Sequence, residues 1–160
     1  MDKILEHSID AAKIAGETIM SFYKTQLNVR EKSPNNPVTK ADIAANDKIK
    51  DLLTSQYPKF GWLSEETKDS LDRLNKEYVW IIDPIDGTKE FIEGIPNFSI
   101  SIGLVQNEIP IVGVLYNPAT KELFYAQKNK GAFYNNNLVK CSKKNDIRNI
   151  NIVVSRSEMN

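Results

Sequence analysis

The stretch Tyr78-Val79-Trp80-Ile81-Ile82-Asp83-Pro84-Ile85-Asp86-Gly87-Thr88 holds the chain's densest cluster of chemically informative residues. Its first five residues are apolar and β-favouring, which predicts a short buried strand. Two carboxylates follow directly, three positions apart, and Pro84 and Gly87 allow the backbone to turn sharply enough for them to converge. Thr88 then offers a hydroxyl and an N–H group where a short helix can start, which is a favourable place for a phosphate.

Two helices are predicted before this strand. Apolar residues recur at spacings of three and four over residues 2–27, and a second helix is predicted from near Thr39 to about Tyr57. The residues of the second helix expected to face inward are Ile43, Ile49, Leu52 and Leu53. The polar stretch 30–37, REKSPNNP, lies between the helices and predicts a loop.

Short strands dominate the rest of the chain. A short strand is predicted at 61–63, and further strands are predicted at 78–82, 98–105, 109–116, 122–127 and 131–134. Residues 151–154 are predicted to begin one more strand. The short turns between neighbouring strands favour an antiparallel sheet. The sequence therefore predicts an α+β fold, with two N-terminal helices packed on a largely antiparallel sheet.

The composition limits the chemistry available to these 160 residues. Lys and Arg number 21 and so do Asp and Glu, which removes the main argument for a protein that coats a nucleic-acid polymer. The single Cys141 and single His7 exclude an internal disulfide, a cysteine-cluster metal site and a two-histidine site. The charged N-terminus is wrong for a signal peptide and the apolar runs are too short to span a membrane, so we expect a cytoplasmic protein without a membrane segment.

Carboxylates from other parts of the chain can join the cluster at 83–88. Oxygen ligands of this kind suit Mg²⁺, although DPIDGT is also an ordinary turn sequence. Glu65-Glu66 ends another strand, where adjacent glutamates are usually solvated. Asp42 lies in the first turn of a predicted helix, in a capping-box pattern, and helix capping alone explains an aspartate there. Alternatively, one of its carboxylate oxygens also faces the metal site. Lys40 and Lys89 are candidates for steadying phosphate charge.

Three stretches, in this order and spacing, resemble the inositol monophosphatase superfamily of Mg²⁺-dependent, lithium-sensitive phosphatases: PVTKAD at 37–42, LSEE at 63–66 and WIIDPIDGT at 80–88. The continuation KEFI at 89–92 is most similar to the 3'(2'),5'-bisphosphate nucleotidase (CysQ-type) branch. The resemblance implies a small phosphorylated substrate, 3'-phosphoadenosine 5'-phosphate, which loses its 3'-phosphate in sulfur metabolism. Inositol-monophosphate and histidinol-phosphate phosphatases are the alternatives within the superfamily.

The resemblance also implies a role for each matched residue. The implied metal ligands are Glu65, Asp83, the backbone carbonyl of Ile85, and Asp86. The implied substrate-binding residues are Glu65, Ile85, Asp86, Gly87 and Thr88. The implied catalytic residues are Asp42, Glu65 and Thr88, where Thr88 with Glu65 or Asp42 orients and deprotonates the attacking water. Two or three Mg²⁺ ions per complete site, and inhibition by Li⁺, are expected.

One feature of the superfamily is not matched. A further aspartate, in a Trp-Asp motif of a second domain, completes the second metal site, and the chain reaches Asn160 before any such motif. We therefore expect residues 1–150 to form a metal-binding phosphatase N-terminal domain and residues 151–160 to begin a truncated second domain. The isolated chain is then expected to be incomplete; the alternative is a catalytically incompetent fragment that binds metal only.

Overall fold

The computed structural model describes residues 3–25, 29–33, 36–143, 146, 148 and 150–154. Its helices are α1 (Lys3–Met20), α2 (Lys40–Gln56), the 3₁₀ helix η1 (Leu71–Asn75) and α3 (Thr88–Ile92). Its strands are β1 (Arg30–Ser33), β2 (Asn36–Val38), β3 (Gly61–Ser64), β4 (Tyr78–Asp86), β5 (Ser99–Gln106), β6 (Ile109–Asn117), β7 (Glu122–Gln127), β8 (Gly131–Tyr134) and β9 (Asn137–Val139).

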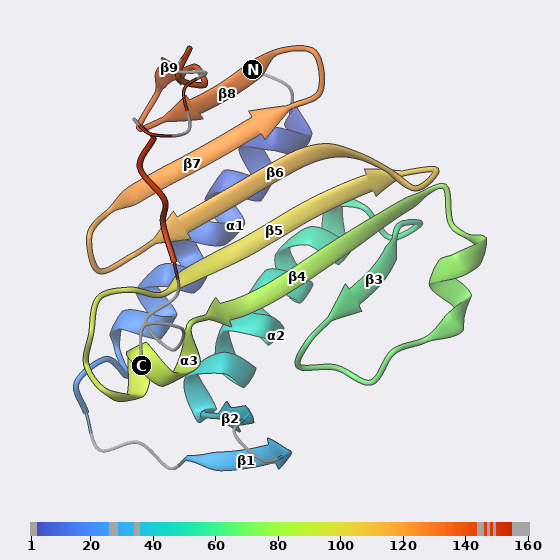
Figure 1. Cartoon of the computed structure of the whole chain (residues 1–160). Coiled ribbons are helices and arrows are strands. Elements are labelled where there is room, and N and C mark those ends of the chain that lie inside the picture. The colour runs from blue at the N-terminus through green and yellow to red at the C-terminus, as the bar shows by residue number, and fades with distance from the viewer. Residues whose placement is uncertain are drawn as a thin grey trace.

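A seven-stranded sheet in the order β3-β4-β5-β6-β7-β8-β9 forms the centre of the molecule (Figure 1). Each pair of neighbours is antiparallel except β3 and β4, which are parallel. From β5 to β9 the order follows the chain because short turns join successive antiparallel strands. Longer connections that contain η1 and α3 join β3 to β4 and β4 to β5. The predicted α+β fold with a largely antiparallel sheet is confirmed.

The two long helices cover one face of this sheet. α1 contacts β5 and β6, α2 contacts β4, and the two helices contact each other. Alternate strand residues point into this layer: Trp80 on β4, Ile100 on β5 and Val114 on β6 are 0–1% exposed. The period-2 alternation of the strands and the apolar stripes of the helices meet here, and their burial forms the core.

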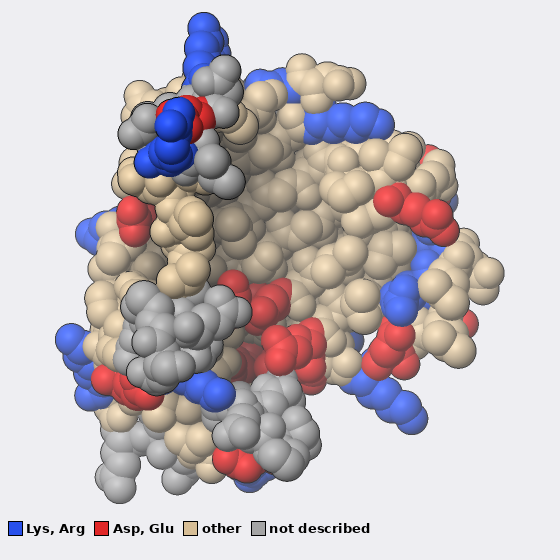
Figure 2. Space-filling view, in the orientation of Figure 1, with Lys and Arg blue, Asp and Glu red and all other residues tan. Residues whose placement is uncertain are grey.

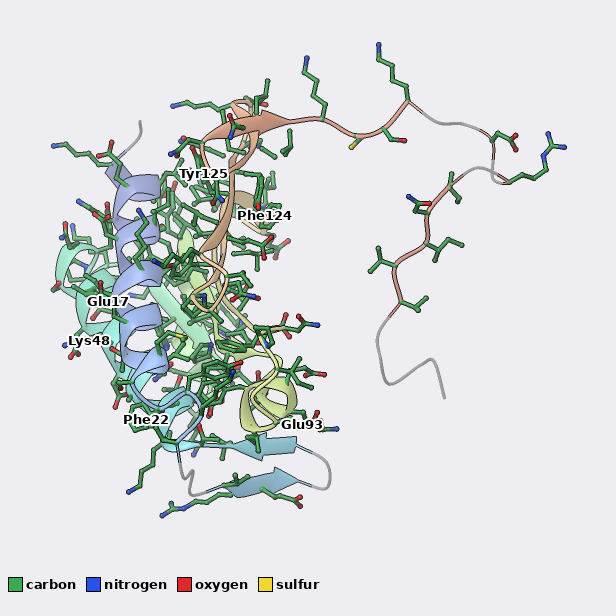
Figure 3. The ribbon with its side chains drawn as sticks, turned by 90° about the vertical axis from the view of Figure 1, so that its left-hand side faces the viewer. Glu17, Phe22, Lys48, Glu93, Phe124 and Tyr125 are labelled. Carbon is green, nitrogen blue, oxygen red and sulfur yellow. The ribbon has the colours of Figure 1, made fainter. Side chains whose placement is uncertain are left out.

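The opposite face of the sheet is open in the described part of the chain. It appears as a broad, hollowed, largely uncharged surface in Figure 2. The side view in Figure 3 shows the helices on the other side of the sheet. Ile81, Leu115 and Phe124 lie on this open face and are 43–45% exposed.

The first predicted helix is shorter than expected. α1 ends at Met20 and the chain then turns, with Lys24 at φ 59°. Tyr23 leaves the helix because its hydroxyl donates to the Gly94 carbonyl (2.6 Å) and its ring lies against Phe91 and Phe98. Residues 2, 26 and 27 of the predicted helix lie outside the described residues.

Two other predictions of local structure need correction. The predicted loop 30–37 is wrong, because β1 and β2 pair there as an antiparallel ribbon. The strand predicted to begin at 151–154 is also wrong: those residues have no regular structure and carry exposed side chains, so no neighbouring strand fixes them. Of the predicted second domain, 151–160, residues 155–160 lie outside the described residues. η1 and β9 were not predicted.

The second predicted helix is confirmed, from Lys40 to Gln56 with Thr39 as its N-cap. Ile49 and Leu53 are buried as expected, but Ile43 is 45% exposed, so its predicted inward position is wrong. Asp42 and Asn46 are buried beside it instead, each 1% exposed. Within the described residues, no helix combines the length and apolar character that crossing a membrane requires.

Candidate active site

The parallel pairing of β3 with β4 brings two carboxylates together. Ser64 lies opposite Ile82 in this pair, and the Glu65 N–H extends the ladder by donating to the Ile82 carbonyl at 3.2 Å. Because parallel strands run to the same edge of a sheet, Glu65 at the end of β3 is placed beside Asp83 of β4. The prediction that Glu65-Glu66 ends a strand is confirmed.

A bulge at the end of β4 orients the other carboxylate. The predicted end of this strand at Ile82 is wrong, because β4 continues to Asp86. Asp83 pairs with Ser101 and Asp86 with Ser99, so three steps along β4 match two steps along β5. Since residues two steps apart on a strand share a face, the extra residue places Asp83 and Asp86 on the same face.

Gly87 makes the turn from β4 into α3. Its φ of 93° lies in the left-handed region, and an added Cβ would stand 2.7 Å from the Asn97 carbonyl oxygen. Both the backbone conformation and the available space therefore require glycine. α3 begins at the next residue, Thr88, so the predicted sharp turn and short helix are confirmed.

Asp42 connects α2 to this turn. Its Oδ2 accepts from the N–H and the hydroxyl of Thr39, each at 2.7 Å, as the acidic partner of a capping box. Its Oδ1 lies 3.2 Å from the Thr88 hydroxyl, which also lies 3.0 Å from the Ile85 carbonyl oxygen. The two interpretations of Asp42 are thus compatible, because one oxygen caps the helix and the other faces Thr88.

The carboxylates act on one another at Asp83. The pKa of this carboxyl group is raised from 3.8 to about 7. Burial is the largest cause, followed by the charge of Glu65, then that of Asp86 and, more weakly, that of Asp42. The Ile85 N–H, which donates to Asp83 Oδ1 at 3.1 Å, opposes the rise by stabilising the charged form. Four carboxylates from three separate segments therefore share one electrostatic environment.

Comparison with known proteins assigns the chain to a family. The chain matches the description "Inositol monophosphatase family" over residues 1–160. The chain belongs to the inositol monophosphatase family. This is a family of magnesium-dependent phosphatases.

Individual relatives agree with that assignment. An inositol monophosphatase of Mesembryanthemum crystallinum is 37% identical over 155 residues, 96% of this chain and 57% of the relative. The 3'(2'),5'-bisphosphate nucleotidase CysQ of Aggregatibacter actinomycetemcomitans is 35% identical over 132 residues, 81% of this chain and 49% of the relative. The crystal structure of the extragenic suppressor protein SuhB from Bartonella henselae matches with a TM-score of 0.84 and 35% identity, over 89% of this chain and 56% of that one. The chain thus spans about half the length of the curated relatives it matches.

The donor set of the site fits the magnesium that the family implies. In the described ranges, no three His, Cys, Asp or Glu side chains are grouped so that they could hold a metal ion by themselves. Mg²⁺ does not require such a cage, because it usually binds through one or two carboxylates together with waters and substrate phosphate. The carboxylates and the Ile85 carbonyl are oxygen ligands of that kind. The negative charges of Glu65 and Asp86 repel that of Asp83, and this repulsion favours binding of a cation between them.

A cavity of about 510 Å³ opens beside Asp86 and Gly87. The described residues that line it include the acids Glu90 and Glu122 but no lysine or arginine. Acidic side chains gather at the end of β4 in Figure 2. Lys40 and Lys89, at the starts of α2 and α3, have exposed side chains, and their action on phosphate stays a prediction.

Asn46 and Ser64 were not singled out from the sequence. Both are buried polar residues, and the Ser64 hydroxyl donates to Asn46 Oδ1 at 2.6 Å. One signal could have found Asn46: it stands four residues after Asp42, and so on the same helical face. Finding Ser64 requires knowledge of how β3 lies against α2.

Proposed function

We propose that this chain provides the metal-binding and water-activating residues of a magnesium-dependent phosphomonoesterase. The observation that carries the proposal is the meeting of carboxylates from distant parts of the chain, because the β3–β4 pairing places Glu65 beside Asp83 and the bulge in β4 puts Asp86 on the same face. The raised pKa of Asp83, about 7, agrees with this crowding. Sites that perturb a pKa in this way are often functional. The last strand of the sheet ends at Val139, which supports the proposal that residues 1–150 form this metal-binding unit.

The proposed ligands of one Mg²⁺ are Glu65, Asp83 and the carbonyl oxygen of Ile85, and those of a second are Asp83 and Asp86, so each ion would use two carboxylates of the chain. When bound, Mg²⁺ supplies positive charge that neutralises phosphate oxygens and makes water more acidic. The substrate phosphate is held at the start of α3, by the N–H groups of Gly87 and Thr88. Glu65, Ile85 and Asp86 contribute to substrate binding through the metal.

Thr88 is the proposed orienting group for the attacking water. Its hydroxyl proton points to either of two acceptors, Asp42 Oδ1 at 3.2 Å or the Ile85 carbonyl at 3.0 Å. The oxygen of that hydroxyl can then accept a hydrogen bond from the attacking water, and Asp42 or Glu65 takes up the proton that this water loses when it attacks the phosphorus. The contact with Thr88 favours Asp42 for this role.

Two substrates follow from different observations. The 3'-phosphate of 3'-phosphoadenosine 5'-phosphate is supported by KEFI at 89–92 and by the relative named as a 3'(2'),5'-bisphosphate nucleotidase. Inositol monophosphate is supported by the relatives named inositol monophosphatase. The acidic lining of the cavity beside Asp86 also favours inositol monophosphate, because Glu90 and Glu122 repel a second phosphate group. Both substrates are phosphate monoesters of small molecules.

Release of inorganic phosphate decides between these substrates. The chain is incubated with each substrate, and with histidinol phosphate, over a range of Mg²⁺ concentrations with and without Li⁺. Because the isolated chain is expected to be incomplete, we expect release that is weak at most, that requires Mg²⁺ and that falls when Li⁺ is added, with Asp86→Asn as an inactive control that keeps its fold by circular dichroism. Magnesium binding without turnover would support the alternative of metal binding alone. Turnover that does not depend on Mg²⁺, or that is unchanged in Asp86→Asn, would refute the site assignment.

A further inference from the structure

A chain of hydrogen bonds joins the turn after β3 to α2. The Glu66 N–H donates to Ser64 Oγ at 3.2 Å, and the Ser64 hydroxyl donates to Asn46 Oδ1 at 2.6 Å. Ser64 is 6% exposed and Asn46 is 1% exposed. Because buried hydrogen bonds polarise one another, a directed chain of this kind fixes its members more firmly than isolated bonds do.

Asn46 and Asp42 share one face of α2, since they stand four residues apart. Asp42 contacts the Thr88 hydroxyl at the start of α3, at 3.2 Å. Asn46 contacts Ser64 at the end of β3. One helical face is therefore bonded to both of the segments that carry the remaining site residues.

Two positions of this face depart from the usual pattern of an amphipathic helix, whose buried face α2 otherwise builds from Ala45, Ile49 and Leu53. Asp42 and Asn46 are each 1% exposed, whereas the neighbouring Ile43 is 45% exposed. Buried polar side chains that replace apolar ones contribute less burial of apolar surface, and they must be hydrogen-bonded to be tolerated. Natural proteins concentrate such departures from local pattern at functional sites.

We propose that Asn46 and Ser64 are positioning residues that hold Glu65 in place to bind Mg²⁺, an inference that rests on the proposed function. Glu65 lies between Ser64, which is bonded to Asn46, and Glu66, whose N–H is bonded to Ser64. The Glu65 N–H is bonded to the Ile82 carbonyl. The backbone on both sides of Glu65 is thus fixed before a cation arrives, and outer hydrogen bonds of this kind orient metal ligands.

Titration calorimetry of the chain with MgCl₂ measures the proposed effect directly. Removal of the hydroxyl by Ser64→Ala should weaken Mg²⁺ binding by roughly 10–100-fold, the usual cost of losing a partner behind a metal ligand. Ser64→Thr keeps the hydroxyl and should restore binding. Asn46→Ala should match Ser64→Ala, and the double variant should be no worse than either, because both act through one bond. Ser64→Cys, with a weak donor of similar size, replaces Ser64→Ala if that variant does not fold.

Ser8→Ala is the matched control for a merely structural effect. The Ser8 hydroxyl is also buried, at 0% exposed, but donates to the Ile4 carbonyl (2.8 Å) on α1. We expect unchanged Mg²⁺ affinity in this variant. Hydrogen exchange without Mg²⁺ gives a second readout: the Glu66 amide should exchange faster in Ser64→Ala and at the wild-type rate in Ser8→Ala.

The outcomes separate this inference from the function on which it rests. Normal Mg²⁺ binding by the wild type, with equal binding by Ser64→Ala, would refute the positioning role and leave the metal site intact. Equal losses in Ser64→Ala and Ser8→Ala would also refute it. A wild-type chain that binds no Mg²⁺ would refute the proposed metal site, and the inference would fail with it.

Discussion

The Asp83 carboxyl group is held where its charge is unfavourable to the fold. Its pKa rises from 3.8 to about 7 in the folded chain. Between these pH values the metal-free folded chain binds more protons at Asp83 than the unfolded chain does. The contribution of this group to stability is therefore complete below about pH 4 and is lost as the pH rises through 7. A bound cation removes the penalty, so stability and metal binding are linked at this residue.

Asp83→Asn should therefore stabilise the metal-free chain at pH 8. We expect a gain of about 1–2 kcal/mol in the free energy of unfolding, less than the full pKa shift implies because the carboxyl is only partly buried and solvent screens its charge. Urea denaturation between pH 5 and pH 8 measures it, and the gain should shrink as the pH falls. Mg²⁺ should stabilise the wild type but not the variant. An equal gain at both pH values would contradict this explanation.

Gly87 offers a test of backbone geometry with a control in the same chain. Gly87→Ala places a Cβ 2.7 Å from the Asn97 carbonyl oxygen at a φ of 93°, so we expect a loss of about 1–2 kcal/mol or more. Gly113→Ala meets nothing within 4 Å, and should be neutral or slightly stabilising. Thermal unfolding of the two variants compares these effects. Equal melting temperatures would mean that the turn before α3 tolerates a side chain.

At the scale of elements, the start of α2 links helix stability to the site. Thr39→Ala removes the acceptor for the Ala41 N–H and one of the bonds that hold Asp42. We expect a loss of about 1 kcal/mol in unfolding free energy and slower phosphate release, because Asp42 is less firmly held toward Thr88. Thr54→Ala is the control, because the partly exposed Thr54 only donates to the Lys50 carbonyl of the same helix (2.8 Å), and it should change neither quantity much. Normal turnover in a destabilised Thr39→Ala would show that the cap and the site are independent.

The elements that the sequence predicted well are those with local signals. α2 was placed within a residue because Thr39, Asp42 and Pro58 mark its ends. β5 and β6 were found because their apolar residues alternate, and β7 and β8 because they flank the short turn at 128–130. The parallel pairing of β3 with β4 has no local signal, since it depends on which edge of the sheet the chain returns to. That pairing nevertheless brings Glu65 to Asp83. The convergence of the candidate residues was therefore implied by the family resemblance and not by any local pattern of the sequence.

The errors in the predictions have physical causes too. Ile43 was assigned to the core wrongly, because it stands six residues before Ile49 and so on another side of α2, whereas Ala45, Ile49 and Leu53 follow one another at four-residue spacing on the buried face. β4 was ended too early because Pro84 and two aspartates suggest a turn. A bulge lets the strand accommodate them and continue to Asp86. At β4 the geometry of the site thus prevailed over a local turn pattern.

At the scale of the whole molecule, the sheet is apolar on both faces but covered on one. Across the open face, Ile81, Gly103, Gly113, Ala126 and Ala132 follow one another from β4 to β8. Most of these side chains are small, so they leave a hollow of about 330 Å³, bordered by the larger Leu115 and Phe124. Exposed apolar surfaces of this kind bind other apolar groups.

The open face should therefore bind a hydrophobic dye while the chain remains fully folded. We expect anilinonaphthalene sulfonate to fluoresce with the native chain at neutral pH, with a near-ultraviolet circular dichroism signal that shows fixed packing, unlike a molten globule. Phe124→Lys places a charge in the middle of this surface and should reduce the fluorescence severalfold. Ile43→Lys is the matched control, because Ile43 is equally exposed, at 45%, but lies on α2. If both variants lower the fluorescence equally, the dye reports general surface charge; if neither does, the dye binds elsewhere and the open face is not an accessible apolar surface.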